Sequence, residues 1–70
     1  MKLTKRELQV LRHLADGMSS RQVAARLGIS YYTVKRYRVK ILRRLGATSF
    51  PHAITIARDE HILRGDPWTT

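Results

Sequence analysis

One stretch, residues 30–45, constrains the fold of this chain more than any other. It reads SYYTVKRYRVKILRRL and contains six basic residues and no acidic one. When the residues are placed at about 100° intervals around a helix axis, Val34, Ile41 and Leu45 fall on one side. The opposite side carries Tyr32, Arg36, Val39, Lys40 and Arg43. The pattern therefore predicts an α-helix that rests on an apolar core and presents a cationic outer face.

The length of 70 residues allows one domain with a single small core. The chain has no cysteine, which excludes disulfides and thiolate metal sites. Its apolar runs are too short for a membrane span, and the N-terminus lacks the apolar segment of a signal peptide. We therefore expect one cytoplasmic domain over residues 1–70, with no membrane association.

The net charge of +9 is unevenly distributed along the chain. The five acidic residues lie near its two ends and are Glu7, Asp16, Asp59, Glu60 and Asp66. Residues 17–57 instead carry eight basic residues, which are Arg21, Arg26, Lys35, Arg36, Arg38, Lys40, Arg43 and Arg44. An ordinary solvated helix mixes the two signs of charge. The uncompensated charge therefore favours a nucleic-acid partner over a merely solvated surface.

Helix start and stop signals divide the chain into four helices. Thr4 with Glu7 forms a capping-box pattern that begins a helix at residues 5–16, and Ser19 with Gln22 repeats it before residues 20–27. The third helix is expected at residues 31–45, and the fourth at residues 50–59, where a proline is tolerated in the first turn. Residues 64–70 are expected to form a short tail. The predicted fold class is all-α.

The second and third predicted helices are joined by the turn Gly28-Ile29-Ser30. Glycine suits the left-handed conformation that follows a helix, and serine suits the N-cap of the next one. Ala24 is small where the two helix backbones must approach. Small residue, turn glycine and flanking apolar positions together predict a helix-turn-helix, with residues 31–45 as its second helix.

The sequence LTKRELQVLRHLADGMSSRQVAARLGISYYTVKRYRVKILRRLG at residues 3–46, followed by Ser49 and Ala53, resembles the DNA-binding domain of the LuxR/FixJ (GerE-like) family of bacterial transcription regulators. The resemblance implies that the third helix enters the major groove of duplex DNA and that the fourth forms a two-fold dimer interface. Most members carry a receiver or ligand-binding domain before this one. The chain is then a single-domain member, which the Met1 start favours, or an excised fragment.

Carried over residue by residue, the resemblance implies base contacts by Lys35, Arg36 and Val39. Thr33 and Lys40 lie beside them towards the phosphates. Arg36 would suit guanine O6 and N7, and Val39 a thymine methyl group. The family often has Asn and His at positions 36 and 37, where this chain has Arg36 and Tyr37. The target sequence therefore does not transfer.

Further predicted contacts surround these base readers. Arg43 is expected to hold phosphate. Tyr31 and Tyr32 either bond phosphate through their hydroxyls or pack against the second helix. Ser20 and Arg21 begin the second helix, where the family touches phosphate, with capping as the alternative for Ser20. The fourth helix is more apolar than one packing face requires, which leaves part of it for a second copy. Its predicted dimer interface comprises Ile54, Ala57 and Arg58.

Arg38 lies near the core side of the helical wheel, so a structural ion pair with Glu7 is favoured over a DNA contact. The three histidines, His13, His52 and His61, have no metal-ligand spacing. The scattered acidic residues offer no paired carboxylates for catalysis. Neither an enzyme nor a cofactor is expected.

The main prediction is a homodimeric, sequence-specific transcription regulator that binds double-stranded DNA in the bacterial nucleoid, or is encoded by a phage. One alternative is a module that docks on RNA polymerase, because sigma-factor region four has similar L-T-x-x-E and L-G-I-S elements. Another is an architectural protein that binds duplex DNA without sequence preference.

Overall fold

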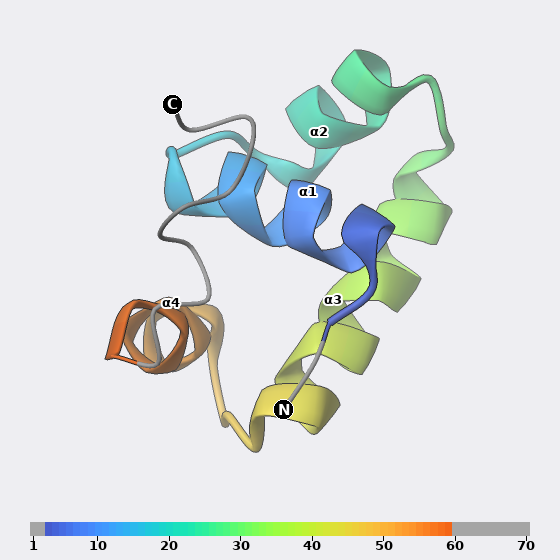
Figure 1. Cartoon of the computed structure of the whole chain (residues 1–70). Coiled ribbons are helices and arrows are strands. Elements are labelled where there is room, and N and C mark those ends of the chain that lie inside the picture. The colour runs from blue at the N-terminus through green and yellow to red at the C-terminus, as the bar shows by residue number, and fades with distance from the viewer. Residues whose placement is uncertain (1–2, 60–70) are drawn as a thin grey trace.

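The computed structural model describes residues 3–59, which form four helices and no strand (Figure 1). The helices are α1 (Lys5–Ala15), α2 (Ser20–Leu27), α3 (Tyr31–Leu45) and α4 (Phe50–Asp59). The predicted all-α class and all four helices are confirmed. The predicted bounds agree except at one end, because Asp16 is the C-cap of α1. The tail at residues 64–70, like His61, lies outside the described residues.

Both predicted capping boxes are present. The Glu7 N–H donates to Thr4 Oγ1 over 3.1 Å, and the Thr4 N–H donates to Glu7 Oε1 over 2.8 Å. Ser19 and Gln22 make the same reciprocal pair at 3.1 and 2.8 Å. Each pair satisfies two backbone N–H groups that lack a partner within the first helical turn. The starts of α1 and α2 are therefore fixed by local sequence.

The turn between α2 and α3 forms as its residues predict. Gly28 adopts a left-handed conformation with φ of 69°, which glycine reaches without the steric penalty of a Cβ. The Ile29 N–H donates to the Ala24 carbonyl over 3.0 Å and so closes α2. Ser30 then begins α3, since its Oγ accepts the Thr33 N–H over 3.0 Å. Three residues therefore join two helices that cross steeply (Figure 1).

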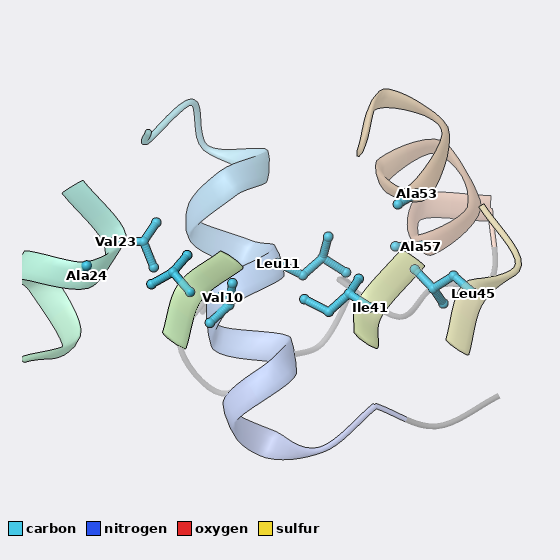
Figure 2. Close-up of a cluster of buried hydrophobic side chains, with 9 residues drawn as sticks. Val10, Leu11, Val23, Ala24, Ile41, Leu45, Ala53 and Ala57 are labelled. Atoms are coloured by element: carbon cyan, nitrogen blue, oxygen red, sulfur yellow. The ribbon is translucent and has the colours of Figure 1, made fainter. Parts of the chain in front are cut away.

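Helix α3 lies at the centre of the fold and contacts each of the other three helices. Its predicted inner residues Val34, Ile41 and Leu45 are buried. They pack with buried residues of α1, α2 and α4, which are Val10, Leu11, Val23, Ala24, Ala53 and Ala57 (Figure 2). Full burial of one Val, Leu or Ile side chain contributes about 1.5–3 kcal/mol. This core fixes the orientation of α3 and so leaves its other face towards solvent.

The predicted ion pair between Arg38 and Glu7 is wrong. Glu7 is buried, and its Oε2 accepts from the Nε of Arg44 over 3.1 Å. The first turn of α1 therefore lies against the C-terminal part of α3. Arg38 lies six residues earlier, about 9 Å along the helix axis, and its side chain is directed to other partners. Within residues 3–59, no helix is long and apolar enough to cross a membrane.

Candidate nucleic-acid interface

The solvent face of α3 carries the residues that the sequence placed there. Lys35, Arg36, Lys40 and Arg43 are exposed, and so are two large apolar side chains of the same helix. Tyr32 is 73% exposed and Val39 is 53% exposed. An exposed valine between cations is the arrangement expected where a side chain meets a base methyl group. The outward orientation predicted from the helical wheel is confirmed for Tyr32, Arg36, Val39, Lys40 and Arg43.

The cations of this face have no acidic partner in the described range. Between residues 3 and 59 the ion pairs are Glu7 with Arg44, and Arg12 with Asp16. Neither pair includes an outer-face cation of α3. An uncompensated group of cations on one face produces a positive potential that attracts anions. This surface is therefore suited to a polyanion.

Four neighbouring residues of α3 surround a depression of about 120 Å³, and they are Thr33, Arg36, Tyr37 and Lys40. Arg36 and Lys40 are one helical turn apart, so their side chains lie on the same side of the helix. The Thr33 side chain is tied to the helix start, since its Oγ1 lies 2.9 Å from Ser30 Oγ. The depression thus offers two cations beside hydroxyl groups, which suits phosphate oxygens and the acceptor edges of bases.

A cluster of aromatic and basic side chains occupies the N-terminal end of α3. The guanidinium carbon of Arg21 lies 4.4 Å from the centre of the Tyr31 ring, and Lys35 Nζ lies 5.4 Å from it. The Tyr32 ring meets the Tyr31 ring edge to face at 5.6 Å. Tyr31 itself is half-buried and packs against the core. The stacking of Arg21 and Lys35 on Tyr31 was not predicted from the sequence.

Arg38 links three helices instead of pairing with Glu7. Its Nη1 donates to Ser20 Oγ over 2.8 Å, and its guanidinium carbon lies 4.7 Å from the centre of the Phe50 ring. Ser20 is buried, with 8% of its surface exposed, and Ser19 is the residue that caps α2. The Ser20 hydroxyl is therefore engaged inside the domain, so neither predicted role of that side chain fits its position.

The predicted interface residues of α4 differ in burial. Ile54 is half-buried at the edge of the core and Arg58 is exposed. Ala57 is completely buried against α3, so it contributes to the domain core and its side chain is not available to a second copy. Because Ala53 is also fully buried, the apolar excess of α4 is partly explained by packing within the domain.

The histidines of the described range do not gather into a cluster. His52 Nδ1 accepts the Thr48 N–H over 3.2 Å at the start of α4, while His13 lies on α1. Among residues 3–59, no three His, Cys, Asp or Glu side chains lie together in a way that could hold a metal ion.

Known proteins are similar to this chain in sequence and in the arrangement of their helices. The luxR family of bacterial regulatory proteins matches residues 1–57. The transcriptional regulatory protein YdfI of Bacillus subtilis is 42% identical over 64 residues, which cover 91% of this chain and 30% of that protein. FixJ of Azorhizobium caulinodans, also a transcriptional regulatory protein, is 38% identical over 55 residues, covering 79% of this chain and 26% of FixJ.

Two solved structures extend the comparison to three dimensions. The response regulator ChrA of a heme-sensing two-component system superposes with a TM-score of 0.83 at 42% identity, over 89% of this chain and 31% of ChrA. VqmA of Vibrio cholerae, in a complex with ligand and DNA, superposes with a TM-score of 0.87 at 36% identity, over 99% of this chain and 30% of VqmA. The chain thus spans about a third or less of the length of these proteins. With a family match over most of its residues and the same fold, the chain belongs to the luxR family of bacterial regulatory proteins.

Proposed function

We propose that this domain binds double-stranded DNA as a sequence-specific transcription regulator, with α3 in the major groove. The observation that carries the proposal is the exposed outer face of α3, whose cations have no acidic partner within residues 3–59. An α-helix fits the width of the major groove, where the pattern of donors and acceptors distinguishes all four base pairs. The DNA-bound structure of the relative VqmA supports this function for the shared fold.

In this proposal, base edges are read by Lys35, Arg36 and Val39. The guanidinium of Arg36 can donate two hydrogen bonds to guanine O6 and N7, and exposed Val39 can contact a thymine methyl group. Contacts to phosphate come from the residues around them, which are Arg21, Tyr32, Thr33, Lys40 and Arg43. Phosphate contacts fix the register of the protein on the duplex, whereas base contacts select the sequence.

The proposal includes a homodimer formed through α4. Ile54 and Arg58 remain accessible at the surface of this helix, and a half-buried isoleucine beside an exposed arginine suits the edge of a small interface. Two copies related by a two-fold axis would present two α3 helices to two half-sites about one turn of DNA apart. The preferred duplex should therefore be palindromic.

Selection of binding sites from random duplex tests specificity and symmetry together. A palindromic motif is the expected result, whereas recovery of random sequences would overturn specificity and favour an architectural protein. Sedimentation of the free protein and of the complex gives the stoichiometry. Two chains per site are expected, and one chain per site would overturn the dimer.

Salt titration tests the electrostatic part of the proposal. If each domain neutralises about four phosphates, log K should fall with log salt at a slope of about −7 for the dimer. As a matched control, the double variant Arg36→Ala, Lys40→Ala is compared with Lys5→Ala, Arg26→Ala, which removes two exposed cations from α1 and α2. The first variant should lose much more affinity than the second. Equal losses would show that binding follows net charge and not the face of α3.

A further inference from the structure

We infer that Tyr31 is a positioning residue for DNA binding, and that its ring holds Arg21 and Lys35 in place before the duplex arrives. The inference rests on the proposed function, because it concerns how the same surface engages DNA. It assigns a role to a residue whose side chain lies beneath the cationic surface and not at its outermost layer.

The geometry of the cluster carries the inference. Arg21 lies in the first turn of α2 and Lys35 in the second turn of α3. Both cations approach the one ring, at 4.4 and 5.4 Å from its centre. The face of an aromatic ring attracts cations within about 6 Å of its centre. Like charges that approach one ring repel each other, and the attraction of each to the ring electrons offsets part of that repulsion.

The ring is itself held in position. Tyr31 is half-buried and packs against the hydrophobic core, and the Tyr32 ring meets it edge to face at 5.6 Å. A long basic side chain loses rotamer freedom when it binds, and a platform that already restricts the side chain reduces this loss. Because the core holds the Tyr31 ring, the ring can restrict the movement of the Arg21 and Lys35 side chains.

Stacking on the ring leaves both cations able to bind DNA. A guanidinium group that lies over an aromatic face keeps its N–H groups at its edge, where they can donate to phosphate oxygens. The Lys35 ammonium group has three N–H donors and lies 5.4 Å from the ring centre, so it can also donate to DNA. The free and bound states can thus share one arrangement of side chains.

A double-mutant cycle measures the effect of the ring on the two cations. The probe is a short fluorescent duplex carrying the selected site, with random-sequence duplex of equal length for comparison. Tyr31→Leu keeps an apolar anchor and removes the ring. It should weaken binding about tenfold per domain, because two long side chains must then lose rotamer freedom on binding. In a background of Arg21→Ala, Lys35→Ala, the same substitution should weaken binding less than about threefold. Equal losses in both backgrounds would overturn the inference.

Two controls separate positioning from a merely structural role. Tyr31→Phe retains the ring and should bind within about threefold of the parent chain. Arg43→Ala removes a cation about 18 Å further along α3, so Tyr31→Leu should still weaken binding about tenfold in that background. Failure of Tyr31→Phe to restore binding, or a smaller Tyr31→Leu effect beside Arg43→Ala, would contradict the role of the ring.

A measurement without DNA keeps this inference distinct from the proposed function. In the free protein, ring-current shifts should move the proton resonances of Arg21 Cδ and Lys35 Cε upfield, and Tyr31→Leu should abolish both shifts while the amide spectrum remains that of a folded domain. Absence of the shifts in the parent chain would overturn the inference even if DNA binds. Absence of DNA binding despite the shifts would instead overturn the proposed function, and with it the role of the ring.

Discussion

The arginines of α3 fall into two groups that differ in surroundings and not in chemistry. Arg38 and Arg44 are turned towards other helices, where they contact Ser20 and Glu7. Arg36 and Arg43 point to solvent, and neither has an ion pair within residues 3–59. The net charge therefore overstates the charge that is available to a partner. In this helix the inner arginines join the helices together and the outer ones are available to bind.

The largest expected effect removes the acid on which the inner group depends. Glu7→Ala deletes the acceptor of both the Thr4 N–H and Arg44 Nε. We expect the free energy of unfolding, measured by urea denaturation, to fall by about 2–4 kcal/mol. Breaking a buried ion pair usually costs about 3–5 kcal/mol. A smaller loss is expected here, because Arg44 is half exposed and can be hydrated in the variant.

Glu7→Gln is the matched control, since its side-chain oxygen can still accept the Thr4 N–H while the charge is removed. It should destabilise less than Glu7→Ala. Should Glu7→Ala lose under about 1 kcal/mol, the inner arginines would matter little to folding and the contrast between the two groups would disappear.

A change in the outer group should affect binding and leave stability almost unchanged. Arg36→Ala is expected to weaken binding of the selected duplex by about 1–3 kcal/mol per domain and to relax selectivity at one base pair of each half-site. Its unfolding free energy should remain within about 0.5 kcal/mol of the parent chain, since the side chain is exposed. Fluorescence titration with the selected duplex and with single-base variants of it measures the effect. Unchanged selectivity would exclude Arg36 as a base reader.

Arg43 and Arg44 are adjacent but belong to different groups, so their variants can be compared directly in stability and in DNA binding. Arg44→Ala leaves Glu7 buried without its cation and should lower the unfolding free energy by about 1–2 kcal/mol. Arg43→Ala removes an exposed side chain, so stability should change by less than about 0.5 kcal/mol. For DNA binding the order reverses: only Arg43→Ala should reduce the magnitude of the salt slope, by about one per domain. Similar behaviour of the two variants in both measurements would remove the distinction between inner and outer arginines.

The fold could be predicted from the sequence because its signals are local. The pairs Thr4 with Glu7 and Ser19 with Gln22 act over one helical turn, and both form as expected. Gly28 and Gly46 end their helices in the left-handed conformation that glycine favours. The spacing of Val34, Ile41 and Leu45 gave the buried face of α3 for the same reason, since helical periodicity needs no knowledge of distant residues.

The partners of individual side chains could not be predicted in this way. A helical wheel gives the direction of a side chain around its axis but not the point along the axis at which another helix crosses. On the wheel Arg38 lies nearer the buried face than Arg44, yet the crossing of α1 and α3 decides that Glu7 meets Arg44. The stacking of Arg21 on Tyr31 likewise depends on the angle between α2 and α3.

The burial of small residues could not be predicted from the sequence either. Ala57 lies on an apolar helix with more than one apolar side, so its pattern fits a core and an interface equally well. Only the packing of α4 on Leu45 and Ile41 places it inside (Figure 2). The burial of Ser20 was also not predicted. A serine at a helix start is usually solvated, whereas Ser20 accepts a hydrogen bond from Arg38 of another helix.

The division of α3 into a buried face and an exposed face also governs how freely the sequence can change. Substitutions at Val34, Ile41 or Leu45 disturb a core to which all four helices contribute. Substitutions at Arg36 or Val39 change no packing within residues 3–59. Single mutations on the exposed face can therefore change the surface that is offered to a partner with little loss of stability.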